Sequence, residues 1–417
     1  MPSKASRLPD SPTLATLGVC IYLVGFAFPV PWQLPLLVLV ACVVLATLSG
    51  GARPPATSSV LNWSVVLFLV ATAASVLASV DRERSLELSA AWIPGVLLFV
   101  VIHERIRSTD RIRILYACLA FVAGALAITL LVATFVRGPN PHEWLGDLGI
   151  PVLVVPNDCN FLALLSPLAL VLAIEKPRSG FGILGAIAVG LVAIVIGVFA
   201  SRGAALTMAV SLVVAAGIIR PRLGLRVGAV LLAGFLVVDG LQGFVLASKF
   251  TRVVDSRISL WMMAWEMFQN APWLGNGPSI YKTLYPVYIQ TMNFPEWVVM
   301  DPWGGAVPWA HNLYLELLAE RGVVGFLAFV GMLGSGLFVA FQVQKDRSPA
   351  ARFLQAGAAA SLCGYAVSGL YETSLVRIWA VVLLLTLLGV AGSLANLSSA
   401  TDPARRRSRG AQSRRRN

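Results

Sequence analysis

The sequence predicts an all-α integral membrane protein of about 12 transmembrane helices, and two observations carry this prediction. Of the 417 residues, 57% are hydrophobic and only 12% are charged, whereas soluble domains average about 45–50% and about 25%. The apolar residues also form long unbroken runs, which are typical of membrane helices and not of the alternating strands of a barrel. The composition therefore excludes a water-soluble globular protein.

Twelve apolar runs are predicted to cross the membrane, because a spanning helix needs about 20 mostly apolar residues. They lie near residues 13–30, 33–49, 61–79, 86–102, 114–136, 158–174, 181–200, 204–219, 224–243, 323–341, 353–370 and 378–396. We divide the chain accordingly into spans 1–9 (1–243), a long, partly helical loop on the outer side before the tenth span (244–322), spans 10–12 (323–396) and a basic cytoplasmic tail (397–417).

The charge pattern predicts that both termini are cytoplasmic. This orientation assigns more than two thirds of the 32 Lys and Arg to the cytoplasmic side, as the positive-inside rule expects. The formal net charge of +12 therefore indicates orientation and not a nucleic-acid partner. The Arg-rich tail is predicted to lie near anionic lipid headgroups. An Arg on the outer face opposes this bias and is therefore a candidate for a functional role.

The long outer loop is too aromatic to be disordered. Residues 244–310 hold more than half of the 11 tryptophans, and such a segment is expected to fold and to lie on the membrane. Within it, one helical stripe of apolar residues predicts an amphipathic interfacial helix: Ile258, Trp261, Met262, Trp265 and Phe268. An aromatic-belt anchor without chemistry is an equally good interpretation of the tryptophans.

Two outer arginines are candidate anion ligands. Arg202 lies in the polar break Ser201–Ala204 between two uncharged runs, where a snorkelling interfacial role is the alternative. Arg257 follows Asp255 and Ser256, either of which is expected to cap the amphipathic helix. A helix N-terminus beside an Arg is an anion site, although an Asp255–Arg257 surface ion pair is the alternative.

His311 is the candidate for proton transfer. It is one of three histidines and the one best placed on the outer face, at the start of a predicted helix. Asn312, Glu316 and Glu320 follow on one stripe of that helix. A lone His is more often structural, but His142 lies in a loop and His103 on the predicted cytoplasmic side, so His311 is the histidine best placed for catalysis.

These residues resemble the O-antigen ligase and O-antigen polymerase superfamily of bacterial envelope glycosyltransferases. The resemblance rests on three segments in order: Ser201–Ala204, the run from Ser256–Arg257 through Trp261 to Pro272–Gly277, and His311–Glu316 continuing to Glu320–Gly322. It implies glycan transfer from an undecaprenyl-diphosphate carrier at the periplasmic face of the bacterial inner membrane. In ligases the acceptor is a sugar hydroxyl of lipid A-core, and the product is lipopolysaccharide.

The residue types also fit this chemistry on independent grounds. Displacement of a diphosphate builds negative charge on the leaving group, which Arg202 and Arg257 are suited to stabilise. The acceptor hydroxyl must lose a proton, which His311 is suited to take or to orient. A single displacement of this kind inverts the anomeric configuration.

No metal or other cofactor is predicted. Glu296 and Asp301 form at best a weak metal site, so we expect metal-independent transfer. Six further residues are second-tier candidates that shape the cleft: Tyr281, Lys282, Asn312, Glu316, Arg321 and Glu372.

Other functions stay open at this point. An O-antigen polymerase or a protein O-oligosaccharyltransferase would share the donor site and differ in the acceptor. A lipid-linked glycan transporter or flippase would place ionisable residues or broken helices near the midplane, where this chain has nearly none. The ligase is favoured because the outer loop is modest and the chain ends soon after the last span.

Overall fold

The computed structural model describes residues 11–31, 33–49, 60–138, 141–147, 150, 159–241, 245–295, 298, 309–342 and 348–401. Within these ranges every regular element is a helix. In chain order they are α1 (Ser11–Ala27), α2 (Gln33–Ser49), α3 (Val60–Ala78), α4 (Arg82–Ala90), α5 (Ile93–Arg105), α6 (Thr109–Arg137), α7 (His142–Asp147), α8 (Cys159–Glu175), α9 (Gly180–Val198), α10 (Arg202–Ile219), α11 (Pro221–Leu241), α12 (Val245–Asn270), α13 (Tyr281–Thr291), α14 (Leu313–Phe341), α15 (Pro349–Ser368) and α16 (Ile378–Thr401).

The helices form the bundle of a multi-pass membrane protein. In the described part of the chain, seven helical segments are long and apolar enough to cross a membrane: Val60–Ala78, Arg82–Arg105, Thr109–Arg137, Gly180–Val198, Arg202–Ile219, Leu313–Phe341 and Ile378–Leu397. Three shorter apolar helices accompany them: Ser11–Ala27, Gln33–Leu48 and Cys159–Glu175. Each of the twelve predicted runs overlaps a helix, but the count of twelve spans stays a prediction.

The core of the bundle is built around α16, which is buried along most of its length. Small residues let its neighbours approach closely, as is typical of membrane helices. A Cβ atom added to Gly95 of α5 would lie 3.0 Å from Leu385 of α16. On the other side of the core, Tyr116 of α6 donates a hydrogen bond to the Leu354 carbonyl of α15 at 2.6 Å.

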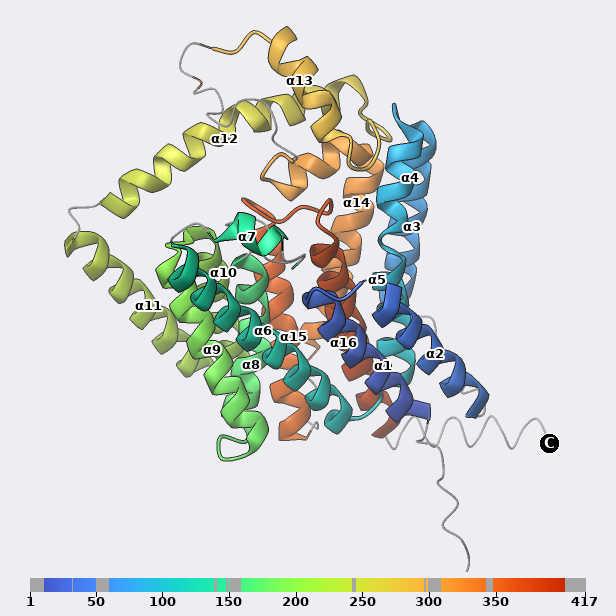
Figure 1. The fold of residues 1–417 in the computed structure, drawn as a ribbon, viewed down its shortest axis with the longest axis vertical. Coiled ribbons are helices and arrows are strands. Elements are labelled where there is room, and N and C mark those ends of the chain that lie inside the picture. The colour runs from blue at the N-terminus through green and yellow to red at the C-terminus, as the bar shows by residue number, and fades with distance from the viewer. Residues whose placement is uncertain are drawn as a thin grey trace, which may run out of the picture.

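One end of the bundle gathers the segments that the sequence places on the outer face. Figure 1 shows α4, α7, α12 and α13 at this end, with α12 crossing it obliquely between α11 and α13. The buried side of α12 presents Leu260, Met263, Ala264 and Met267 to the aromatic rings of α13 and to α14. The predicted stripe lies on the more open side, where Trp265 is 47% exposed.

A glycine-rich turn after α12 fixes the shape of α14. Gly322 has φ +61° and interrupts the helical backbone of α14. The turn at residues 272–277 packs against the interrupted part of α14 through two backbone hydrogen bonds. Val323 N donates to the Pro272 carbonyl at 2.8 Å, and Gly277 N donates to the Glu320 carbonyl at 2.9 Å. A Cβ atom at position 322 would lie 2.3 Å from the Trp273 carbonyl oxygen. Only glycine therefore fits both the backbone angle and the close approach.

The expected start of the amphipathic helix is wrong. We expected Asp255 and Ser256 to cap it, but α12 begins at Val245, so these residues and Arg257 lie inside a helix. No Pro or Gly occurs between residues 245 and 256 to stop the helix from extending towards its N-terminus. The anion site proposed from a helix N-terminus at this position does not exist.

Candidate active site

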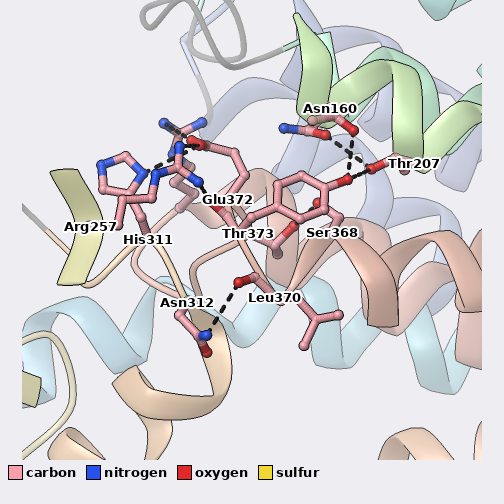
Figure 2. A network of polar contacts seen from close by, with 12 residues as sticks. Asn160, Thr207, Arg257, His311, Asn312, Ser368, Leu370, Glu372 and Thr373 are labelled. Atoms are coloured by element: carbon pink, nitrogen blue, oxygen red, sulfur yellow. Dashed lines mark hydrogen bonds and ion pairs between the residues drawn. The ribbon is translucent and has the colours of Figure 1, made fainter. Parts of the chain in front are cut away.

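Glu372 is the centre of a polar cluster at the end of the bundle that carries α12. It lies in the segment between α15 and α16, and its side chain is only 3% exposed. Glu372 Oε2 lies 3.4 Å from Arg257 Nη2 and 3.3 Å from His311 Nδ1, while Oε1 lies 3.6 Å from Arg377 Nη2. Figure 2 shows Arg257 and His311 converging on this carboxylate. Three separate segments of the chain therefore meet at one buried charge.

His311 is held in a specific orientation immediately before α14. Its φ is +50°, a left-handed conformation that costs a non-glycine residue about 1–2 kcal/mol. The next residue, Asn312, caps α14 by accepting hydrogen bonds from Tyr314 N at 3.0 Å and Leu315 N at 3.1 Å. Asn312 Nδ2 also donates to the Leu370 carbonyl at 3.2 Å. The cap thus attaches His311 to the segment that carries Glu372.

Arg377, immediately before α16, lies on another side of the Glu372 cluster. Its guanidinium carbon lies 4.3 Å from the centre of the Trp309 ring, which is the geometry of a cation–π contact. The Trp309 and His311 rings lie 5.5 Å apart between centroids. Trp309 and Arg377 therefore form a wall beside His311.

Tyr371 connects this cluster to α10. The Arg257 guanidinium donates to the Tyr371 carbonyl, and the Tyr371 hydroxyl donates to the Gly203 carbonyl at 2.6 Å. The same hydroxyl hydrogen-bonds with Thr207 of α10, whose Oγ1 lies 3.2 Å from Asn160 Oδ1 of α8. The labelled Thr207 and Asn160 mark this side of the network in Figure 2.

Arg202 lies beside this contact, at the first position of α10. Burial lowers the pKa of Arg257, which Glu372 opposes, and the positive charge of Arg202 lowers it further. The two guanidinium groups are thus within electrostatic reach. Arg202 Nη1 is buried and has no hydrogen-bond partner among the residues that the structure describes.

Among the side chains that the structure describes, the cluster carries excess positive charge. Arg202, Arg257 and Arg377 are always charged, and the carboxylate of Glu372 compensates one of them. The buried donors without a hydrogen-bond acceptor in the described ranges include two at this cluster, Arg202 Nη1 and Trp309 Nε1. Because buried donors and cations are costly when they stay unsatisfied, this arrangement is suited to bind an anion.

The structure brings all three predicted catalytic residues together, with Glu372 from the second tier. It separates the others from the cluster or gives them structural contacts. Tyr281 is buried and donates to the Leu260 carbonyl at 3.0 Å, and Lys282 is exposed on α13. Glu316 is buried and accepts from Ser374 Oγ at 2.6 Å. Arg321 is buried in an ion pair with Glu320 at 3.1 Å.

Sequence reasoning missed Tyr371 and Arg377. Both lie in the short segment between the last two predicted spans, from which only Glu372 was selected. Arg377 also opposes the positive-inside bias, as Arg202 does, so the same argument would have found it. Tyr371 offers no such signal, because its role depends on a contact with α10.

No group of three or more His, Cys, Asp or Glu side chains is arranged to hold a metal ion within the described ranges. Glu296 and Asp301, the weak metal pair, lie outside the described residues. Metal-independent transfer therefore stays a prediction.

Comparison with known proteins agrees with the sequence motifs. Residues 160–330 match the family model described as O-antigen ligase, and this match contains Arg202, Arg257 and His311. No curated protein sequence matches the chain significantly. The match over residues 160–330 supports a relationship to the O-antigen ligase and polymerase superfamily, whose members are glycosyltransferase-like membrane enzymes.

Proposed function

We propose that the chain is an O-antigen ligase. It transfers a glycan from undecaprenyl diphosphate to a sugar hydroxyl of lipid A-core at the periplasmic face of the inner membrane. The observation that carries the proposal is the convergence of Arg257, His311, Glu372 and Arg377, with Arg202 beside them. This site combines excess positive charge for a diphosphate with an oriented imidazole for a hydroxyl.

The arginines act on the leaving group. As the bond between the anomeric carbon and the diphosphate oxygen breaks, negative charge grows on the diphosphate. Fixed guanidinium groups in a partly buried site stabilise that charge without reorganising. Arg257 is held by Tyr371 and Glu372, and Arg202 has a donor available at Nη1. These two side chains therefore bind the diphosphate.

His311 acts on the acceptor. A hydrogen bond from Nδ1–H to Glu372 at 3.3 Å leaves Nε2 free of its proton and able to accept one. The acceptor hydroxyl gives its proton to Nε2 while its oxygen bonds to the anomeric carbon. The products are the new glycosidic bond, undecaprenyl diphosphate and protonated His311. Attack opposite the leaving group inverts the configuration.

Product analysis with purified protein tests this proposal. The protein is incubated with an undecaprenyl-diphosphate glycan and, separately, with rough lipopolysaccharide, a second donor molecule or a Ser/Thr peptide. A ligase extends only the lipopolysaccharide. Glycan extension on the second donor identifies a polymerase, and a glycopeptide identifies a protein oligosaccharyltransferase. The matched control is Arg82→Ala, which removes an exposed arginine of α4; it is expected to retain full transfer.

A further inference from the structure

The contacts of Tyr371 have a consequence for the selectivity of the site. Tyr371 contacts one arginine through its main chain and the neighbour of the other arginine through its side chain. Its carbonyl accepts from Arg257 on α12, and its hydroxyl donates to the carbonyl of Gly203 on α10, next to Arg202. One residue therefore spans the gap between the two helices that supply the anion ligands.

The tyrosine ring is fitted tightly to this place. A Cβ atom added to Gly203 would lie 2.6 Å from Tyr371 Cε2, so the glycine after Arg202 leaves room for the ring. Thr207, one turn further along α10, is fully buried and hydrogen-bonds with the same hydroxyl. Burial raises the pKa of Tyr371 to about 12. The hydroxyl therefore stays protonated, and remains a donor, throughout the ordinary assay range.

In the described part of the chain, α12 and α10 have no extensive direct packing, and α11, which packs on α10, precedes α12 in sequence. The buried face of α12 packs against α13 and α14, whereas α10 packs mainly against α8, α11 and α15. Near the two arginines themselves, the contact between α12 and α10 runs through the segment between α15 and α16, in which Gly369 also accepts from Leu313 N at 2.7 Å.

We propose that Tyr371 is a positioning residue that sets the spacing between Arg202 and Arg257, and that this spacing selects a lipid diphosphate over a lipid monophosphate. The inference rests on the proposed function. A diphosphate presents two phosphoryl groups, so two fixed guanidinium groups engage it together, whereas a monophosphate has one group to offer. Tyr371 lies beyond the residues that match the family model.

The test measures binding without turnover. Purified wild-type protein, Tyr371→Phe and the matched control Tyr314→Phe are titrated with undecaprenyl diphosphate and with undecaprenyl monophosphate. Tyr314 is a suitable control because its hydroxyl also donates to a backbone carbonyl, that of Ala366, at 2.7 Å. Tyr371→Phe removes the hydrogen bonds of the hydroxyl with both Gly203 and Thr207, and hydrogen bonds of this kind contribute modestly. We therefore expect Tyr371→Phe to weaken diphosphate binding about three- to tenfold and to leave monophosphate binding unchanged.

Kinetics give a second readout. In transfer assays, Tyr371→Phe is expected to raise the donor KM by the same factor with kcat within about twofold of wild type. Partial unfolding would lower the apparent kcat and leave KM unchanged. Should Tyr371→Phe fail to fold, Thr207→Val removes the hydroxyl partner without touching the ring, and it is expected to shift the binding ratio in the same direction.

The outcomes separate the two proposals. A diphosphate preference that falls in Tyr371→Phe and persists in Tyr314→Phe supports the positioning role. Equal weakening of both lipids, or the same change in both tyrosine variants, overturns it while the proposed function stands. Wild-type protein that does not bind undecaprenyl diphosphate overturns the proposed function itself.

Discussion

Two neighbouring Arg–Glu clusters in this molecule have opposite characters. In the first, Arg321 and Glu320 are almost completely buried. Glu320 accepts from Ser279 N at 2.8 Å and from Tyr281 N at 3.2 Å, and Arg321 lies over the Trp92 ring. In the second, Arg257 and His311 keep 18% and 19% of their side chains exposed around Glu372.

The difference teaches how to distinguish structural charge from functional charge. The Glu320 carboxylate is satisfied by backbone donors and by Arg321, so this cluster fastens the glycine-rich turn to α14. Counted over the described residues, the Glu372 cluster has more cations than anions, and Arg202 Nη1 has no hydrogen-bond partner there. Partial exposure and excess positive charge mark the second cluster as the candidate binding site. An unpartnered donor alone does not distinguish the clusters, because Arg321 Nε is also buried without a hydrogen-bond partner among the described residues. The predictions below test this contrast.

The largest effect is expected from the three proposed catalytic residues. His311→Ala, Arg257→Ala and Arg202→Ala should each lower transfer by about 10³-fold or more, because each removes a group that acts on the reacting atoms. Expression and the unfolding temperature should stay near wild type, since these side chains are partly exposed. A lipopolysaccharide ladder in a ligase-deletion strain measures the loss. Full complementation by any variant would remove that residue from the mechanism.

Arg321→Ala should act on stability instead. It leaves the carboxylate of Glu320 buried beside an empty space, and breaking a buried ion pair costs about 3–5 kcal/mol. We expect a marked fall in the unfolding temperature and in the amount of folded protein. The transfer rate per folded molecule should change little. A variant with normal stability and no activity would contradict the assignment of Arg321 to a structural role.

Glu372→Gln is expected to have an intermediate effect. The amide keeps the shape of the side chain but removes the charge that pairs with Arg257, His311 and Arg377. Loss of the group that orients a catalytic imidazole should lower kcat by about 10²-fold. Single-turnover kinetics on purified protein measure this change. An unchanged kcat would show that Glu372 only assembles the fold.

Gly322→Ala tests the structural role of the Glu320–Arg321 cluster with a smaller expected loss of stability than Arg321→Ala. The substitution places a Cβ atom 2.3 Å from the Trp273 carbonyl oxygen and forces a non-glycine residue to φ +61°. We expect destabilisation of about 1–3 kcal/mol without a change in donor KM. Gly331→Ala on the same helix is the control, because a Cβ atom there meets open space.

The smallest effect is expected from chelation. EDTA should leave the rate of transfer by purified protein unchanged, because the guanidinium groups supply the charge that a metal ion would otherwise supply. Activity that disappears with EDTA and returns with a divalent cation would contradict metal independence.

The sequence predicted the helical class and the three catalytic candidates because these depend on local signals. Apolar runs identify membrane helices, and an Arg against the charge bias stands out in one dimension. Arg257 was selected for an incorrect reason, since α12 continues through the predicted cap. Its true support comes from Tyr371 and Glu372, more than a hundred residues away. Such long-range contacts have no local signature, so neither Tyr371 nor the central position of Glu372 was predictable.

The most direct test of the central claim is an experimental structure of the wild-type protein with undecaprenyl diphosphate bound. We predict phosphate oxygens within hydrogen-bonding distance of the guanidinium groups of Arg202 and Arg257, with His311 Nε2 facing the end of the diphosphate that carries the glycan in the donor. A diphosphate bound elsewhere, or one that contacts neither arginine, would contradict the account.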